Sequence, residues 1–505
     1  MIIDLSISAL TFFLVTYLHI STASSLPVVD LGYELHQAFS LNETAKLYNF
    51  SNIRYAAPPL GNLRFRAPLP PKVVCPQATP IWSRYIMPQF LTSYFTNATS
   101  SASLDVSSYP VPLIQDPRIS EDCLFLDVVG ETPVPKESLA PVIVYFYGGG
   151  YVLGGKGGVD PSGLIQRSQQ QGKDGVIYVA LNYRLGAFGW LAGHTVSRKG
   201  TPNAAPHDQR LGLTWVAQNI HLFGGDADRV TVMGVSAGSG SIFHQLTAYK
   251  GLQGPSLFQR AILQSPAWEP NYDSDKQEQT FRQYLKLLNV STIEEARQLP
   301  SEKLIAANTH QVSGSPYGTF TYGPVVDGVF VADLPGKLLL RGEFDHSVKI
   351  LNGHTLNEAL MYTPPSSFQE RVSSALSDIC FQCNSYHLNH AYSNSTYTYV
   401  FSIPPAMHWM DHPYSFYIKG GKPLVENPLF QVTNETVAFI LQDYITSFVQ
   451  TGKPTSSLAP PLEIYGPESQ VVSIGSNNIT RMRDPACNAR CVYWQTALTY
   501  SQDDL

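Results

Sequence analysis

The feature that most constrains this chain is a serine set between glycines directly after an apolar run. Residues 229–233 read RVTVM, the next five, 234–238, read GVSAG, and a helix-like pattern continues to Tyr249. Glycines two residues before and two after Ser236 leave room for a strained strand-to-helix turn, because a Cβ at either place would clash with nearby backbone. Such a turn presents a serine hydroxyl as a nucleophile. The following helix also points its N-terminus at the serine, which favours developing negative charge.

The rest of the chain alternates short apolar runs with longer helix-like stretches. The runs are continuously apolar, as expected for parallel strands that are covered on both faces. They lie at 142–147, 176–181, 229–233, 261–263, 348–351 and 396–401, and the clearest helical stretches at 211–223 and 238–249. With no internal repeat or long linker, this order predicts one α/β domain built on a doubly wound, mostly parallel sheet.

A second motif precedes the serine by about ninety residues. Three glycines, Gly148, Gly149 and Gly150, follow the apolar run at 142–146. Consecutive glycines let main-chain N–H groups approach a developing oxyanion, and Gly149, Gly150 and Ala237 are the expected donors. A flexible turn or a phosphate loop would also use glycines. No G-x-x-x-x-G-K-[ST] pattern is present to support nucleotide binding.

Composition and charge limit the classes of molecule that the protein is expected to bind. The 505 residues are 44% hydrophobic and 14% charged, which suits a well-buried globular enzyme. The formal net charge is −6 and Lys and Arg form no run, so a nucleic-acid-binding groove is not expected. The chemistry outlined below needs no cofactor, and no cysteine pair stands near a histidine cluster that would bind zinc.

The N-terminus resembles a secretory signal. An apolar stretch from Leu5 to Leu18 precedes small residues, and we expect a signal peptide at 1–23 and the catalytic domain at 24–505. The n-region carries Asp4 and no basic residue, so an uncleaved membrane anchor is the alternative; no other segment could span a bilayer. N-glycosylation signals, which fit export, stand at Asn42, Asn49, Asn97, Asn289, Asn394, Asn434 and Asn478.

Several stretches together resemble the type-B carboxylesterases, the α/β-hydrolase family that includes cholinesterases and fungal extracellular lipases. The matching stretches include IRYAAPPLGNLRFRAP (53–68), SEDCLFLDV (120–128), LNYRLGAFGWL (181–191), the run 208–241 around Ser236, and RAILQSPAW (260–268). They occur in the family's order and cover most of residues 28–270. VDLGY and PPAMHWMDHPYSFY look most like the fungal branch.

The resemblance implies a Ser–Glu–His triad. Glu358, in ILNGHTLNEALMY, matches the family's acid, with Asp345 as the nearest rival. His408, after Pro404-Pro405, matches the general base, and His412 is its rival. The acid would orient the imidazole, which takes the Ser236 proton and returns it to the leaving alcohol.

The resemblance also implies supporting features. Ser265, in LQSP, would support the triad acid, although a buried packing serine is equally compatible. Among six cysteines, Cys75 pairs with Cys123 by resemblance, closing a Ser/Thr/Pro-rich loop. Cys487 pairs with Cys491 by proximity, which leaves Cys380 with Cys383.

The main departure from the family is spacing. Only 50 residues separate Glu358 from His408, fewer than in typical relatives, with the missing part near 364–367. A more open or a less stable site would follow.

The expected function is secreted hydrolysis of a small-molecule or lipid carboxylic ester through an acyl-serine. Two alternatives remain at this point: a non-catalytic binding protein on the same fold, and an acyltransferase of secondary metabolism that passes the acyl group to an alcohol.

Overall fold

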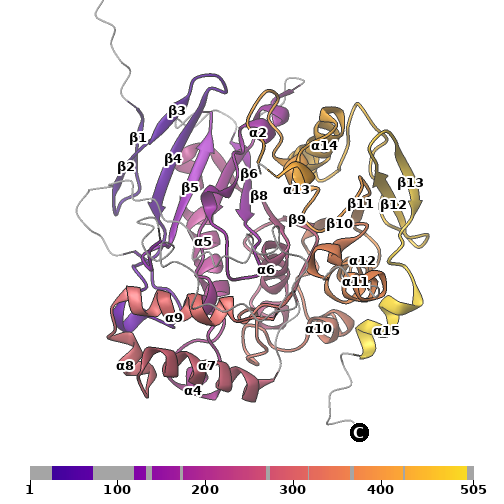
Figure 1. Cartoon of the computed structure of the whole chain (residues 1–505). Helices are drawn as coiled ribbons and strands as arrows, with labels where there is room; N and C mark the ends of the chain where they lie inside the picture. The colour runs from indigo at the N-terminus through magenta and orange to yellow at the C-terminus, as the bar shows by residue number, and fades with distance from the viewer. Residues whose placement is uncertain are drawn as a thin grey trace, which may run out of the picture.

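One twisted sheet organises the molecule. The computed structural model describes residues 26–71, 119–131, 139–170, 175–268, 273–316, 318–363, 369–424 and 427–497. Within these ranges eleven strands form the sheet, in the order β13-β12-β11-β10-β9-β8-β6-β7-β5-β4-β3, and β1 pairs with β2 apart from it (Figure 1). The strands are β1 (Val28–Asp30), β2 (Leu35–Gln37), β3 (Ser40–Asn42), β4 (Leu47–Arg54), β5 (Phe125–Gly130), β6 (Ala140–Phe146), β7 (Ile177–Leu181), β8 (Gly225–Val235), β9 (Arg260–Gln264), β10 (Lys349–Thr355), β11 (Tyr397–Phe401), β12 (Gln470–Ile474) and β13 (Ile479–Arg483).

The middle of the sheet is parallel and its edges are antiparallel. Parallel pairing runs from β7 through β6, β8, β9, β10 and β11 to β12. The pairs β5–β7, β4–β5, β3–β4 and β12–β13 are antiparallel. All five residues of β7 are buried, as its unbroken apolar run requires. The predicted α/β-hydrolase class, with a mostly parallel sheet, is confirmed, and each of the six expected apolar runs contributes to a strand.

Helices lie on both sides of the sheet. Both α5 and α6 pack against β8, while α14 packs against β6, β8 and α2 (Figure 1). The helices are α2 (Ser162–Ser168), α3 (Gly186–Trp190), α4 (His194–Lys199), α5 (Ala204–Asn219), α6 (Ala237–Leu246), α7 (Ser274–Leu288), α8 (Ile293–Arg297), α9 (Ser301–Ser313), α10 (Pro335–Arg341), α11 (Gln369–Ser377), α12 (Cys383–Ala391), α13 (His412–Ser415), α14 (Glu435–Thr451) and α15 (Ala489–Ala497).

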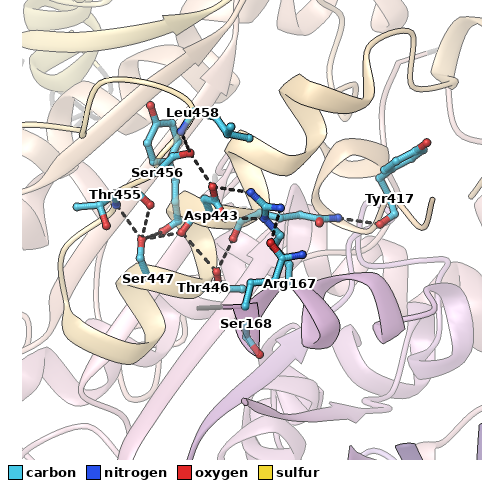
Figure 2. A network of polar contacts seen from close by, with 12 residues as sticks. Arg167, Ser168, Tyr417, Asp443, Thr446, Ser447, Thr455, Ser456 and Leu458 are labelled. Atoms are coloured by element: carbon cyan, nitrogen blue, oxygen red, sulfur yellow. Dashed lines mark hydrogen bonds and ion pairs between the residues drawn. The ribbon is translucent and has the colours of Figure 1, made fainter. Parts of the chain in front are cut away.

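Helix α14 shows how the sequence places these helices. Asn434 caps its first turn by accepting a hydrogen bond from the N–H of Thr436 (3.0 Å), and Gly452 ends it in the left-handed conformation. A polar network then fixes α14 to α2. The carboxylate of Asp443 accepts hydrogen bonds from Nε and Nη2 of Arg167 (2.6 and 2.8 Å) and from the hydroxyl of Ser456 (2.6 Å) (Figure 2).

The carboxyl ends of four neighbouring parallel strands carry the predicted site. Ser236 directly follows β8 and Ser265 directly follows β9. Glu358 comes three residues after β10 and His408 seven residues after β11. Ligands of open α/β sheets bind at this edge, so the fold gathers the candidate residues where a substrate can reach them.

Candidate active site

The predicted turn at Ser236 is present. β8 ends at Val235, α6 begins at Ala237, and Ser236 between them adopts φ 57° and ψ −126°. A Cβ on Gly238 would lie 2.0 Å from the carbonyl oxygen of Phe146, and one on Gly234 would lie 2.6 Å from the carbonyl carbon of Gly238. Neither glycine can therefore carry a side chain without moving backbone. The strain at Ser236 is held by this close packing.

The glycine loop after β6 lies directly against the serine. A Cβ on Gly148 would be 2.6 Å from the carbonyl oxygen of Val235 and 3.1 Å from the Cβ of Ser236. Gly149 and Gly150 have φ angles of 118° and 58°, which non-glycine residues rarely adopt. Within the described residues, the N–H groups of these two glycines donate no hydrogen bond. They remain available to a ligand oxygen beside Ser236.

Glu358 and His408 form a close buried pair. Nδ1–H of His408 donates to Oε2 of Glu358 over 2.6 Å, and the main-chain N–H of His408 donates to the carbonyl oxygen of Glu358 over 3.2 Å. The other carboxylate oxygen, Oε1, accepts from the N–H of Thr355 at 2.7 Å. Glu358 is fully buried and His408 is 2% exposed. Both carboxylate oxygens thus have a donor, which fixes the orientation of the imidazole.

The remaining ring nitrogen of His408 has no hydrogen-bond partner among the described residues. Nε2 is buried and makes no hydrogen bond within the described part of the chain. The rings of Phe381 and Tyr362 lie against the imidazole, with centroid distances of 4.3 and 5.4 Å. Phe320 lies against Gly150, where a Cβ would come within 2.1 Å of its ring. Aromatic groups therefore bound the site near the imidazole and near the glycine loop.

One residue connects the serine turn to the loop that carries the histidine. The carbonyl oxygen of Gln264, the last residue of β9, accepts from the N–H of Ser236 at 2.9 Å. Its side-chain Nε2 donates to Oδ2 of Asp411 at 3.2 Å and to the hydroxyl of Ser415 at 3.1 Å. Asp411 follows His408 by three residues. No hydrogen bond joins the hydroxyl of Ser236 to Nε2 of His408 in this structure, so the serine half of the relay is open.

Asp411 is a second buried carboxyl beside the pair. Its Oδ2 also accepts from the hydroxyl of Tyr399 at 2.6 Å. Burial and the nearby charge of Glu358 raise the pKa of Asp411 to about 6, against the opposing effects of the Tyr399 hydrogen bond and of His408. No sequence motif had singled out this carboxyl group.

The two alternative candidates, Asp345 for the acid and His412 for the base, lie away from the Glu358–His408 pair. Asp345 stands before β10 begins, at the opposite end of the strand from Glu358, and it accepts hydrogen bonds from Ser256 and Ser347. His412 is buried, with Nε2 3.2 Å from the hydroxyl of Tyr145, and burial lowers its pKa to about 3. Neither rival contacts the pair formed by Glu358 and His408.

Ser265 occupies a strained position but does not bind the acid. Its φ is 47°, its N–H donates to the carbonyl oxygen of Gly353 at 2.7 Å, and its buried hydroxyl has no partner among the described residues. The carboxylate of Glu358 is bound instead by the N–H of Thr355 and by Nδ1 of His408.

The expected pairing of Cys487 with Cys491 is wrong. Cys491 forms its disulfide with Cys383, 108 residues away, where α15 packs on α12. Proximity in sequence suggested the wrong partner because the pairing depends on how these two helices pack. The pairing of Cys380 with Cys383 fails for the same reason. Cys75 lies outside the described residues, so its pairing with Cys123 stays a prediction.

Other predictions fall partly outside the described ranges. The signal at 1–23, the glycosylation signal at Asn97 and the shortened stretch at 364–367 all lie there. Of the glycosylation candidates inside, Asn42, Asn289 and Asn478 are exposed, whereas Asn49, Asn394 and Asn434 are half-buried. Among the helices that the structure describes, none has the length and apolar character needed to cross a bilayer.

A family model decides the assignment. The model described as "Carboxylesterase family" matches residues 37–366, which include Ser236 and Glu358. The chain belongs to the carboxylesterase family.

Individual relatives agree with this assignment. The chain is similar to "Carboxylesterase patB" of Penicillium expansum, with 38% identity over 550 aligned positions that cover 94% of this chain and 96% of the relative. It is also similar to "Secreted triacylglycerol lipase LIP1" of Gibberella zeae, with 30% identity over 66% of this chain and 58% of the lipase. Among solved structures it resembles EstA of Aspergillus niger, at a TM-score of 0.79 and 25% identity, covering 94% of this chain and 99% of EstA.

Membership of the family makes the protein a carboxylic ester hydrolase of the type-B carboxylesterase and lipase kind. The buried Glu358–His408 pair, the strained serine turn and the unpartnered glycine N–H groups are compatible with that chemistry.

Proposed function

We propose that the protein hydrolyses carboxylic esters through an acyl-enzyme formed on Ser236, with His408 as general base and Glu358 as its orienting acid. The observation that carries this proposal is the 2.6 Å contact between Nδ1 of His408 and Oε2 of Glu358. That contact keeps the proton on Nδ1 and leaves Nε2 as the acceptor, without a hydrogen-bond partner in the described part of the chain. A free, oriented base of this kind suits proton transfer from a serine hydroxyl.

The reaction then proceeds in two acyl transfers. The hydroxyl oxygen of Ser236 attacks the ester carbonyl carbon while its proton passes to Nε2 of His408. The tetrahedral intermediate collapses when the C–O bond to the alcohol breaks and the imidazolium returns the proton to the departing alkoxide. Water, activated in the same way, attacks the acyl-serine and releases the acid. Glu358 stays ionised and stabilises the imidazolium formed in each step.

Main-chain N–H groups receive the negative oxygen. Gly149 and Gly150 directly follow Gly148, which lies against Ser236, and Ala237 begins α6, where the first N–H groups of a helix have no intrahelical acceptor. The proton path requires the Ser236 hydroxyl to approach Nε2 of His408. Catalytic hydrogen bonds are often long without a ligand and tighten in the substrate complex.

Turnover of a short-chain aryl ester tests the proposal. Ser236→Ala should reduce kcat by at least about 1000-fold, because the acyl-enzyme cannot form. Ser265→Ala is the matched control, since its hydroxyl is also buried beside the sheet edge but touches neither member of the pair. Wild-type turnover by Ser236→Ala would refute the assignment. Ester products formed in place of acid when alcohols are added would favour acyl transfer over hydrolysis.

We further propose that the protein is exported. The disulfide between Cys383 and Cys491 is typical of an oxidising compartment, and similarity to a secreted fungal lipase agrees with it. In a eukaryotic secretory host the mature protein should appear in the medium, begin near residue 24 and shift in mass on glycosidase treatment. Retention in the cell with Met1 intact would contradict export.

A further inference from the structure

The loop that carries Glu358 is held by a neighbouring π-helix. The segment from Thr355 to Ala359 leaves the end of β10 and passes beside η9 (Asp378–Gln382), a π-helical turn between α11 and α12. Nε2 of Gln382 donates to the carbonyl oxygens of Thr355 (3.1 Å) and Leu356 (2.8 Å). The hydroxyl of Ser377 accepts from the N–H of Ala359 at 2.8 Å. Main-chain groups on both sides of Glu358 are thus fixed.

The same turn also contacts the base. Phe381, next to Gln382, lies against the ring of His408 at a centroid distance of 4.3 Å, with the two planes tilted by 42°, and stacks on Tyr362 at 5.6 Å. Both Phe381 and Gln382 are nearly buried. In a regular α-helix two consecutive residues point about 100° apart, since there are 3.6 residues per turn. The wider π turn brings Ser377, Phe381 and Gln382 to one side, and π-helical turns are frequent at functional sites.

The π-helical turn η9 is held in turn by contacts with the C-terminal helix α15. Oδ2 of Asp378 accepts from Nε of Arg490 at 2.6 Å, and Cys383, the residue after Gln382, is bonded to Cys491. Nε2 of His387 lies 2.7 Å from the carbonyl oxygen of Cys491. The C-terminal helix α15 therefore supports the turn that supports the acid.

We propose that η9 positions the acid–base pair of the esterase, with Gln382 as the positioning residue for Glu358 and Phe381 as the support of the His408 ring. Gln382 touches no reacting atom. It fixes two carbonyl groups of the acid loop, so that the N–H of Thr355 in the same loop stays directed at Oε1 of Glu358. This inference rests on the function proposed above, because η9 can position an acid–base pair only if Glu358 and His408 are catalytic.

Replacing Gln382 by methionine tests the proposal. Methionine keeps the length of the side chain but removes both donors, so the acid loop loses its two side-chain hydrogen bonds. We expect kcat to fall by about 10- to 100-fold with KM within about threefold of wild type, because a misplaced catalytic pair slows chemistry more than binding.

Gln442→Met is the matched control. Gln442 is also buried in a helix and donates from Nε2 to two main-chain carbonyl oxygens, those of Tyr414 (3.4 Å) and Tyr417 (2.8 Å). It lies on α14 and contacts neither Glu358 nor His408. Both variants should unfold at a similarly lowered temperature, whereas only Gln382→Met should lose kcat. A purely structural role for Gln382 predicts equal effects of the two variants on kcat, and that result would overturn the proposal.

A second variant covers the case in which Gln382→Met does not fold. Ser377→Ala removes only the hydroxyl that accepts from Ala359, and a fall of kcat by a few-fold at unchanged KM is expected. Wild-type kcat in Ser377→Ala under those circumstances would reject the proposal. Failure of the proposed function is recognised separately: Ser236→Ala would then retain activity in the same assay, whatever Gln382→Met does.

Discussion

Two polar regions of this molecule differ in how completely their groups are paired. In the network between α2 and α14, Asp443 accepts three hydrogen bonds, and Arg167 donates from Nε and Nη2 to Asp443 and from Nη1 to Gln170 at 2.7 Å (Figure 2). Beyond the carboxyl ends of β11 and β6, Nε2 of His408 and the N–H groups of Gly149 and Gly150 have no hydrogen-bond partner among the described residues. Unpaired buried polar groups cost stability. The paired network therefore stabilises the contact between α2 and α14, whereas the candidate active site keeps polar groups available for a substrate.

The largest expected effect comes from the imidazole with the free nitrogen. His408→Ala should reduce kcat/KM by at least about 1000-fold, because no other group can accept the serine proton. The control His412→Ala removes a buried histidine four residues away that contacts Tyr145 instead of Glu358. It should retain kcat/KM within about tenfold. Steady-state hydrolysis of an aryl ester measures both, and a reversal of the two results would identify His412 as the base.

A methyl group added to the glycine loop should cause the next largest loss of kcat. Gly148→Ala places a Cβ 2.6 Å from the carbonyl oxygen of Val235, so the loop must move away from Ser236. Loss of one oxyanion donor costs about 100- to 1000-fold in kcat, and a fall of that size is expected. Gly157→Ala is the control, because its Cβ would meet no atom within 4 Å. Equal kcat values for the two variants would show that the loop's position is unimportant.

In the paired region a substitution should affect stability and leave catalysis intact. Arg167→Met leaves the partly buried carboxylate of Asp443 without its charged partner. Urea unfolding should show a loss of about 1–3 kcal/mol, with kcat/KM of the folded enzyme unchanged. Arg167→Met combined with Asp443→Leu should recover part of that loss, since no uncompensated charge then remains. A large fall in kcat/KM would mean that the two regions are coupled.

The smallest expected effect is a pH dependence of stability. Burial lowers the pKa of His207, His244 and His387 to about 4 and that of His412 to about 3. Unfolding lets these rings bind protons with ordinary affinity, so their contribution is complete above pH 6.5 and is lost as the pH falls from 6.5 to about 4, and to about 3 for His412.

The carboxyl group of Asp411 changes the stability with pH in the opposite direction to these histidines. With its pKa raised to about 6, the folded protein binds the proton more tightly than the unfolded chain, so stability from this group falls as the pH rises from about 4 to 6. Asp411→Asn removes this compensation, and its unfolding free energy should decline more steeply than that of wild type between pH 6 and 4. Identical slopes in urea titrations would contradict the assignment.

Much of the fold and of the site could be predicted because the signals are local. The continuous apolar run in β7 specifies a strand covered on both faces, and the glycines around Ser236 specify the turn. The resemblance to esterases placed Glu358 and His408, which the structure brings into contact.

The remaining features depend on contacts between distant segments. Cys491 meets Cys383 only because α15 packs on α12, and Gln382 reaches the acid loop only because η9 takes a π-helical turn. Sequence spacing carries no information on either. The contact of the Ser265 N–H with the carbonyl oxygen of Gly353 likewise depends on the packing of β9 beside β10, which no local pattern reports.

Mapping a covalent adduct tests the central claim most directly. A fluorophosphonate should react with the wild-type protein at one serine, and peptide mass spectrometry should place the adduct on Ser236. Labelling should disappear in Ser236→Ala and become slow in His408→Ala, where the base is missing. An adduct on another serine, or undiminished labelling of Ser236→Ala, would contradict the claim that this strained residue is the nucleophile.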